Sequence, residues 1–387
     1  MNFALSEDLE MLRKVVREFA TKQIAPNADE WDEKHYFPYK EAIKPMGELG
    51  FFGTVIPEAY GGTEMGWLAA MIITEEIARA SSSLRVQVNM QVLGCAYTIL
   101  TYGGEELKKK YIEKLVEAEY IGGFAITEPD AGSDVMAMSS KAEDKGDHWL
   151  LNGSKTWISN ASDADVVIYY AYTDPSQGSK GMSAFVVELK NFNGVKTSKL
   201  DKMGSHSSPT GEIFLTDTKV PKENIIGKPG DGAKIVFSSL NQTRLSAAAG
   251  AVGLAQACLD TAVSYCKERR QFGKPVGEFQ MNQDMIAQMS TEIEAARLLV
   301  YKAAWAKDQG RLNNGLDVAQ AKYFAGEAVT KCANYAMRIL GAYGYSTEYP
   351  VARFYRDTPT YTMVEGSANI CKWIIALDQL GIRKANR

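Results

Sequence analysis

The spacing of apolar residues changes twice along this 387-residue chain, and this change restricts the possible folds more than any other feature. Apolar residues recur at helical spacing to about residue 117, and short β-rich runs separated by turn residues follow from about 120 to 221. Helical spacing returns after Gly230-Asp231-Gly232. We expect an α+β fold with an N-terminal helical domain (1–118), a central β domain (119–226) and a C-terminal helical domain (227–387). A doubly wound parallel sheet is not indicated, because helices and strands do not alternate.

Local signals place the individual elements. Ser6 before Glu7-Asp8 indicates a helix start. The dipeptide Asn152-Gly153 lies between the β-rich runs 148–151 and 154–158, which predicts a β-hairpin with a type I′ turn. Further strands are expected at 166–170, 184–187 and 212–215, and long helices at roughly 233–267, 278–309 and 316–341.

Charge and composition exclude several classes of function. The formal net charge of −4 argues against nucleic acid or an anionic membrane as the main partner. No apolar run approaches the length needed to span a bilayer, and the start MNFALSEDLE lacks a signal-peptide pattern, so we expect a cytoplasmic protein without membrane insertion. The five cysteines contain no CxxC pair and the three histidines do not cluster, which favours free thiols and no metal site.

The segment 361–370 combines a lone carboxylate with a helix start. Apolar residues recur at helical spacing after Gly366, namely Ile370, Trp373, Ile374, Leu377 and Leu380, so Glu365 is expected in a turn before a helix. The free N–H groups of that helix start, with Ser367 and Asn369, would suit a phosphate of a nucleotide cofactor. An ordinary surface turn is the alternative for these residues alone.

Three further stretches could contribute to a cofactor site. The loop 124–134 offers small and hydroxyl residues to a polar ring or phosphate, and Trp157-Ile158-Ser159-Asn160 places an aromatic ring near a hydroxyl. Arg269-Arg270 at a predicted helix end would suit a pyrophosphate. A turn-rich loop, a core tryptophan and helix capping explain the same residues without a ligand. Neither a Rossmann nor a P-loop motif is present.

Taken together and in this order, these elements resemble the acyl-CoA dehydrogenase family across essentially the whole chain. The resemblance rests on Thr127-Glu128-Pro129, Gly132-Ser133-Asp134, Trp157-Ile158-Ser159-Asn160, Arg269 with Phe272-Gly273, Glu348-Tyr349-Pro350, Arg356-Asp357 and Glu365-Gly366. Within the family, the chain is most similar to glutaryl-CoA dehydrogenases, especially across Ser82-Ser83-Leu84-Arg85-Val86-Gln87. The fold class implied is acyl-CoA dehydrogenase-like, with the domain order given above.

The resemblance implies a homotetramer that holds one FAD in each subunit. Thr127 and Ser159 would contact the isoalloxazine, with Trp157 packed against it, while Arg269 and Phe272 would reach the cofactor of a neighbouring subunit. Ser367 and Asn369 would bind the phosphate end of the cofactor. The remaining cofactor candidates are Phe124, Ile126, Gly132, Ser133, Gln280, Arg338 and Gly341. Arg338 stands where some relatives have glutamine.

The same resemblance implies the reaction and the substrate contacts. Glu365 would remove the α-proton of an acyl-CoA thioester while a β-hydride passes to the flavin, and electrons would then pass to electron-transfer flavoprotein. Asn241 and Arg244 would contact the pantetheine, and Ser133 would lie at the boundary between flavin and acyl-CoA. The substrate-binding candidates also include Arg85, Asn89, Val364 and Gly366.

Arg85 matches the arginine that pairs with the distal carboxylate in glutaryl-CoA dehydrogenases, so glutaryl-CoA is the expected substrate. A solvated arginine at a helix end is the alternative. Asn89 and Val364 stand where the decarboxylating enzymes have serine and tyrosine. Because valine cannot hydrogen-bond, we expect oxidation to stop at glutaconyl-CoA without loss of CO₂.

Three other functions remain open on the sequence alone. The enzyme could oxidise a cyclic or short-chain acyl-CoA, or it could be a decarboxylating glutaryl-CoA dehydrogenase that gives crotonyl-CoA. A non-catalytic binding protein could also retain the fold. His206 replaces an arginine common in the family and is expected to be either a hydrogen-bonded structural histidine or a tuned group near the cofactor.

Overall fold

The N-terminal region is a set of mostly short helices. A computed structural model describes residues 4–382. Its first helices are α1 (Glu7–Phe19), α2 (Ala28–Glu33), α3 (Lys44–Glu48), α4 (Gly66–Ala80), α5 (Arg85–Gln87), α6 (Tyr97–Tyr102) and α7 (Glu105–Val116). The helix start expected at Ser6 is confirmed, because the Ser6 side chain accepts a hydrogen bond from the N–H of Leu9. Helix α4 is buried along almost its whole length.

Three π-helical segments interrupt these helices, at Ala20–Ile24, Tyr39–Ile43 and Val88–Ala96. The third follows α5 directly and is buried throughout. Single π-turns often occur at functional sites. This segment carries Asn89, and α5 carries Arg85, so both side chains come from one continuous buried stretch.

The central region forms one eight-stranded sheet. Its strands are β1 (Gly122–Ala125), β2 (Lys141–Asp144), β3 (His148–Ser159), β4 (Val166–Tyr172), β5 (Met182–Glu188), β6 (Val195–Lys199), β7 (Thr210–Pro221) and β8 (Ile225–Ile226). The strand order is β6-β7-β3-β2-β4-β5-β8, with β1 beside β4. Strand β4 pairs in parallel with β1 and antiparallel with β5, whereas β3 pairs antiparallel with β7. The strands expected at 166–170, 184–187 and 212–215 are confirmed.

The hairpin expected at Asn152-Gly153 is wrong. Strand β3 runs straight through this dipeptide from His148 to Ser159, and its register with β7 shifts between Leu151 and Gly153. A Cβ on Gly153 would lie 2.2 Å from the Ser140 hydroxyl oxygen. The glycine therefore allows a β-bulge and the close approach of Ser140, and it does not form a turn.

The C-terminal region is a helical bundle whose three long helices lie where the sequence predicts them. They are α8 (Gly232–Glu268), α9 (Gln280–Asp308) and α10 (Gly315–Leu340). A short hairpin of β9 (Arg270–Gln271) and β10 (Lys274–Pro275) joins α8 to α9. The bundle ends with α11 (Ala342–Tyr345), α12 (Pro350–Asp357), α13 (Thr360–Met363) and α14 (Ala368–Gln379).

Helix α8 corrects the expectation that no apolar run has the length needed to span a bilayer. Within the described residues, it is long and apolar enough to cross a membrane by length and composition alone. However, 72% of that apolar window is buried inside the protein, where α8 packs against α4, α9 and α10. Its apolar length therefore reflects a core position in the bundle.

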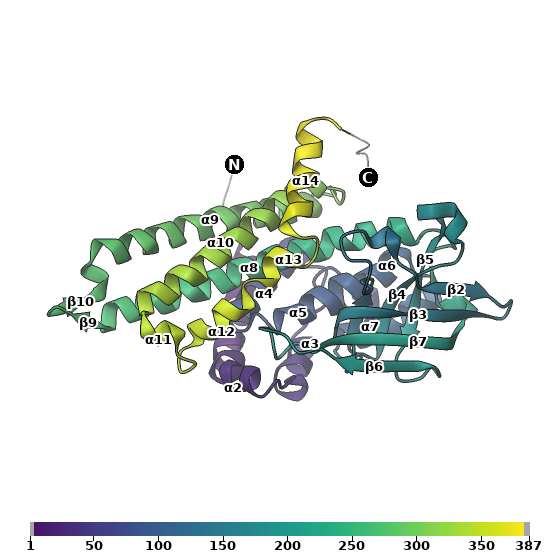
Figure 1. The fold of residues 1–387 in the computed structure, drawn as a ribbon, viewed down its shortest axis with the longest axis horizontal. Helices are drawn as coiled ribbons and strands as arrows, with labels where there is room; N and C mark the ends of the chain where they lie inside the picture. Colours follow the sequence, from purple (N-terminus) through teal and green to yellow (C-terminus); the bar gives the residue numbers. More distant parts are fainter. Residues whose placement is uncertain (1–3, 383–387) are drawn as a thin grey trace.

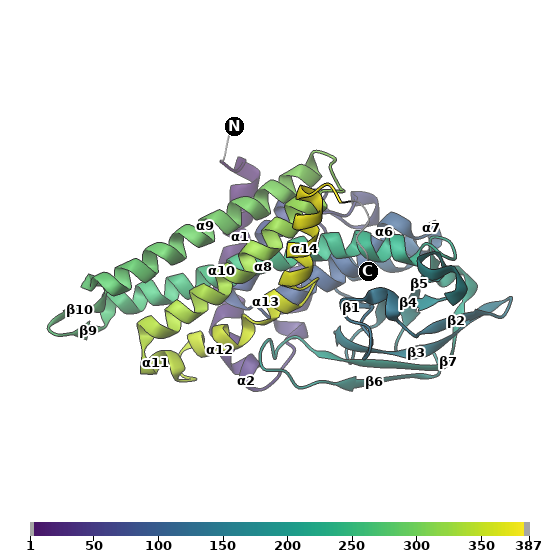
Figure 2. The same ribbon diagram turned by 45° about the horizontal axis from the view of Figure 1, so that its top comes forward.

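The sheet and the long bundle extend in opposite directions from the centre of the molecule (Figure 1). Turning the molecule shows α13 and the start of α14 near the middle, beside α8 and α10 (Figure 2). The segment that carries Glu365 joins α13 to α14, so it lies where the three regions meet. Ser367 caps α14 by accepting from the N–H of Ile370, which confirms the helix start expected after Gly366.

Candidate active site

A cavity of about 1660 Å³ lies at the junction of the three regions. Its walls come from α5 and the following π-helix, the loop after β1, the end of β3, the first half of α8 and the segment from α13 to α14. Small-molecule pockets are usually about 300–1,000 Å³. This cavity therefore has room for a cofactor and a second ligand together.

Glu365 lines this cavity and is held by side chains from two other elements. Its Oε2 accepts a hydrogen bond from the hydroxyl of Thr243, on α8, and its Oε1 lies 3.4 Å from Nδ2 of Asn89. Its backbone carbonyl accepts from Nε of Arg244 at 2.8 Å. The carboxylate is half-buried, so a ligand in the cavity can reach it.

The backbone at Glu365 is itself unusual. Glu365 has φ of 59° and Gly366 has φ of 80°, so two successive residues occupy the left-handed region. A Cβ at Gly366 would lie 2.7 Å from an Arg244 guanidinium nitrogen, so a larger residue there would displace Arg244 as well as strain the backbone. A non-glycine residue in this region costs free energy and is found most often at functional sites. This turn directs the Glu365 side chain toward Thr243 and Asn89 instead of along a helix face.

Arg85 lies on another wall of the same cavity and is only 3% exposed. Within residues 4–382, its guanidinium makes no ion pair, and Nε is buried without a hydrogen-bond partner. The guanidinium carbon instead lies 4.9 Å from the ring centroid of Tyr361. Because a buried cation without an anion is costly, this arrangement suits a ligand that brings its own carboxylate. The alternative of a solvated arginine is wrong.

The candidates for the flavin ring line the cavity from the sheet side. Thr127 and Ser159 are half-buried there, Trp157 is 59% exposed, and Gly132 and Ser133 are exposed on the adjoining loop. Trp157 has φ of 60°, at the point where β3 ends. A strained backbone that presents an exposed indole beside two hydroxyl groups fits a planar, polar-edged cofactor. Phe124 and Ile126 also line the cavity, although each is more than 90% buried.

A buried ion pair supports the loop that carries these residues. The Lys155 ammonium donates to Glu128 at 2.8 Å and to the carbonyl of Ile126 at 3.2 Å, while Ser139 and Ser140 donate to the same carboxylate. Burial opposes the charge on Glu128, but Lys155 and the serines hold its pKa at about 2. Burial lowers the pKa of Lys155 to about 8. The pair is therefore ionised between these two values.

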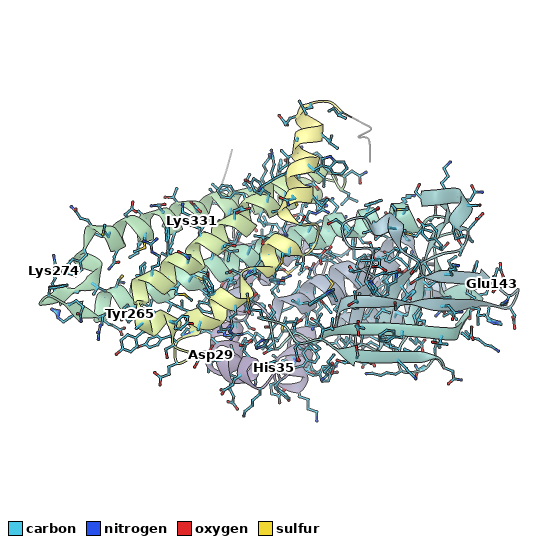
Figure 3. All side chains as sticks on the ribbon, in the orientation of Figure 1. Asp29, His35, Glu143, Tyr265, Lys274 and Lys331 are labelled. Carbon is cyan, nitrogen blue, oxygen red and sulfur yellow. The ribbon has the colours of Figure 1, made fainter. Side chains whose placement is uncertain are left out.

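The cavity is also lined by five other predicted site residues, namely Asn241, Arg244, Val364, Gly366 and Ser367. Five predicted cofactor residues do not line it, because they lie at the far tip of the bundle: Arg269, Phe272, Gln280, Arg338 and Gly341. Figure 3 marks this tip with Tyr265 and Lys274, at the opposite end of the molecule from Glu143 on the sheet. Asn369 is exposed on α14, outside the cavity lining.

His206 is part of a hydrogen-bonded junction between the regions. Its Nε2 lies 2.7 Å from the carbonyl of Lys202, and its ring stacks on His35 with centroids 4.0 Å apart. Arg356 and Asp32 contact its Nδ1 edge. These contacts favour the structural role over a group that acts on a ligand.

Sequence reasoning missed two residues that contact the predicted ones, Thr243 and Tyr361, and a third, Lys322, that holds Tyr361. Thr243 lies between the predicted Asn241 and Arg244, so its position on the same helical turn was available as a signal. Tyr361 and Lys322 gave no such signal. In the sequence, Tyr361 has the pattern of any core aromatic residue, and Lys322 has that of any surface lysine. Lys322 is 1% exposed and donates to the carbonyl of Tyr361 at 2.6 Å.

Comparison with known families agrees with this architecture. Residues 6–119, 123–218 and 230–379 match, respectively, the N-terminal, middle and C-terminal domains of acyl-CoA dehydrogenase. The chain belongs to the acyl-CoA dehydrogenase family. It is 78% identical to a glutaryl-CoA dehydrogenase of Desulfococcus multivorans over 100% of both chains.

Solved structures of acyl-CoA dehydrogenases match equally well. A glutaryl-CoA dehydrogenase in complex with glutaryl-CoA superposes with a TM-score of 0.98 and 78% identity, over 100% of this chain and 98% of the other. The butyryl-CoA dehydrogenase of Megasphaera elsdenii gives 0.95 and 37% identity, over 98% and 100%. The family resemblance and the fold class expected from the sequence are confirmed.

Proposed function

We propose that this acyl-CoA dehydrogenase oxidises glutaryl-CoA to glutaconyl-CoA and keeps the distal carboxylate on the product. The observation that carries the proposal is Arg85, a buried guanidinium without an anionic partner in the cavity that also holds Glu365. A dicarboxylic thioester supplies the missing anion at one end and an acidic α-carbon at the other. A monocarboxylic acyl chain would leave Arg85 without an anionic partner.

The charge around the acyl end supports a dicarboxylate. Three cations lie in this part of the protein, since Lys322 interacts electrostatically with both Arg85 and Arg244, and also with Glu365. Against them the cluster has one carboxylate, Glu365. The excess positive charge favours a second carboxylate from the ligand. The similarity to a protein named glutaryl-CoA dehydrogenase, and to a solved complex with glutaryl-CoA, agrees with this substrate.

FAD fits the residues present on the sheet side of the cavity. Thr127 and Ser159 would hold the ring edge, Trp157 would pack against the ring, and Ser367 at the α14 start would bind a phosphate. When bound, FAD supplies a hydride acceptor. Electron-transfer flavoprotein as the acceptor of its electrons, and a homotetrameric assembly, are part of this proposal.

The protein residues account for the proton transfer. Glu365 removes the α-proton, and the hydrogen bonds from Thr243 and Asn89 set the direction of its carboxylate beforehand. No described residue accepts a hydrogen bond from the Glu365 backbone N–H. This N–H is therefore free to donate to the thioester carbonyl as negative charge develops on its oxygen.

Retention of the carboxylate follows from the residues beside Glu365. Loss of CO₂ requires the resulting dienolate to be reprotonated near the distal end, so a group beside Glu365 must direct the proton that Glu365 has taken from the α-carbon toward that end. Val364 lines the cavity but has no hydrogen-bonding side chain, and the Asn89 amide is directed at Glu365. The oxidised product therefore leaves with its carboxylate intact.

Anaerobic mixing of the purified holoenzyme with acyl-CoA thioesters tests both parts. We expect glutaryl-CoA to bleach the flavin faster than butyryl-CoA or a cyclohexane-carboxyl thioester, and mass analysis to find glutaconyl-CoA. Crotonyl-CoA with CO₂ would refute carboxylate retention. Loss of the glutaryl preference in Arg85→Gln is expected, and an unchanged preference would refute the role of Arg85.

A substitution at position 364 tests the reason for carboxylate retention. Val364→Tyr adds a hydroxyl beside Glu365, and we expect CO₂ to appear among its products. Val364→Phe is the matched control, because it adds the ring without the hydroxyl. Labelled CO₂ trapped from [¹⁴C]glutaryl-CoA measures the difference, and equal release by both variants would contradict the hydrogen-bonding argument.

A further inference from the structure

Tyr361 makes a cation–π contact with Arg85, and its own position is fixed by hydrogen bonds and by packing. Its hydroxyl lies 2.8 Å from the Ser82 hydroxyl, and its backbone carbonyl accepts from Lys322. Its ring is completely buried beside the guanidinium. A substituent on Gly326, one turn beyond Lys322 on α10, would lie 2.8 Å from the same carbonyl, so the helix packs tightly against this backbone. The ring therefore has little freedom to move.

Helix α8 confines the same pair from another side. A Cβ at Gly250 would lie 2.9 Å from Cδ of Arg85, 3.0 Å from its Nε and 3.1 Å from the Tyr361 hydroxyl oxygen. The glycine thus allows the helix backbone to approach the arginine stem closely. As a result, both the stem and the ring of Tyr361 are packed against one helix.

These contacts order Arg85 before a carboxylate binds. An unpaired arginine on a flexible stem should lose much rotational freedom when it binds a carboxylate, which weakens binding. A guanidinium that lies over a buried aromatic face is partly compensated without an anion, and its stem is already ordered. The empty pocket can then present a preoriented cation.

We propose that Tyr361 is a positioning residue that holds Arg85 for the distal carboxylate, and that it thereby sets the preference for dicarboxylic over monocarboxylic thioesters. The inference rests on the proposed function for the identity of the substrate. It assigns the selectivity to a pair, Arg85 with Tyr361, and to the close approach of α8 at Gly250.

A role in core packing alone would make a different prediction. A residue that only fills space supports the whole cavity, so its removal lowers the turnover of every substrate by a similar factor. A residue that positions Arg85 affects the substrate with the carboxylate most. The ratio of kcat/KM for glutaryl-CoA to that for butyryl-CoA separates the two roles.

The test compares four variants of the holoenzyme at matched FAD content. Tyr361→Leu removes the aromatic face and should lower the ratio by about 10-fold, as a desolvated cation–π contact predicts. Tyr361→Phe keeps the face, and Ser82→Ala removes only the hydroxyl contact, so each should change the ratio less than about 3-fold. Gly250→Ala displaces the arginine stem while keeping both partners, and should also lower the ratio. It replaces Tyr361→Leu if that variant fails to fold.

Arg85→Gln separates failure of this inference from failure of the proposed function. If Arg85→Gln leaves the ratio unchanged, Arg85 does not select the dicarboxylate, and the part of the proposed function that rests on Arg85 is refuted. If Arg85→Gln abolishes the preference while Tyr361→Leu and Gly250→Ala keep the ratio within about 2-fold of wild type, Tyr361 has no positioning role and the proposed function stands. A loss in Tyr361→Leu that is equal for both substrates also overturns the inference.

Discussion

Glu365 shows how a single carboxylate acquires a chemical role from its surroundings. Hydrogen bonds from Thr243 and Asn89 and the left-handed backbone together fix its direction. Glu365→Gln keeps the shape and polarity but cannot accept the proton. We expect the rate of flavin reduction by glutaryl-CoA to fall about 10²–10⁴-fold.

Stopped-flow absorbance of the holoenzyme measures that rate, and the spectral change on substrate binding shows that the ligand still enters. Glu327→Gln is the matched control, because Glu327 is exposed on α10 outside the cavity lining. A Glu365→Gln variant that reduces the flavin at a wild-type rate would exclude Glu365 as the base.

Lys322 gives a prediction about pH. Burial, with help from Arg244 and Arg85, lowers its pKa from 10.5 to about 8. Between these values, the unfolded chain binds a proton that the folded protein has already lost, so stability rises with pH across this window. Each pH unit corresponds to about 1.4 kcal/mol, so the gain is about 3 kcal/mol.

The measurement is the thermal midpoint of wild type and of Lys322→Met at several values between pH 8 and 10.5. Wild type should gain stability relative to the variant as the pH rises, because methionine has no proton to lose. A constant difference between the two proteins would show that Lys322 is not titrating in this range.

At the scale of single elements, the loop after β1 depends on the ion pair of Glu128 and Lys155. Lys155→Met leaves Glu128 buried with its hydrogen bonds from Ser139 and Ser140 but without a cation. Breaking a buried pair in this way costs about 3–5 kcal/mol. We expect a lower thermal midpoint and partial loss of FAD, measured by flavin absorbance after desalting.

Lys190→Met is the control, because the Lys190 side chain is 57% exposed where it pairs with Asp165. Removing an exposed pair costs about 1 kcal/mol or less. If both variants lose the same stability and the same FAD, the buried pair has no special role in holding the loop.

The elements also show where sequence reasoning succeeded and where it failed. The helices α8, α9 and α10 were predictable, because a long amphipathic pattern can hardly form anything else. Strand β3 was not, since Asn152-Gly153 satisfies the local rule for a turn while the close approach of Ser140 requires a glycine in an extended strand. Pairing with β2 and β7 overrode the local preference.

At the scale of the whole molecule, the candidate site depends on contacts between residues far apart in sequence. Glu365 meets Asn89 and Thr243 only because three regions converge on one cavity. The family motifs placed the chemical groups, but no local pattern reports that Tyr361 lies beside Arg85 or that Lys322 supports the Tyr361 backbone. Such long-range pairs are visible only after folding.

The tip of the bundle carries cofactor candidates that one subunit alone does not bring to its cavity. Phe272 is 93% exposed there, and Met281 and Tyr345 are each 82% exposed, which is unusual for large apolar side chains unless they meet a partner. We predict that Arg269 serves the FAD of a neighbouring subunit. Arg269→Gln should then lower both FAD content and activity.

Mixed oligomers distinguish a neighbour's site from the subunit's own site. Arg269→Gln chains keep Glu365, whereas Glu365→Gln chains keep Arg269, and each variant alone should have low activity. If Arg269 acts across the interface, co-expression under two affinity tags should restore activity, because a Glu365→Gln chain completes the cofactor site of its Arg269→Gln neighbour. If Arg269 acts within its own chain, every subunit of the mixed oligomer keeps one defect. A doubly purified mixed oligomer that is no more active than the two variants alone would therefore place Arg269 outside any shared site.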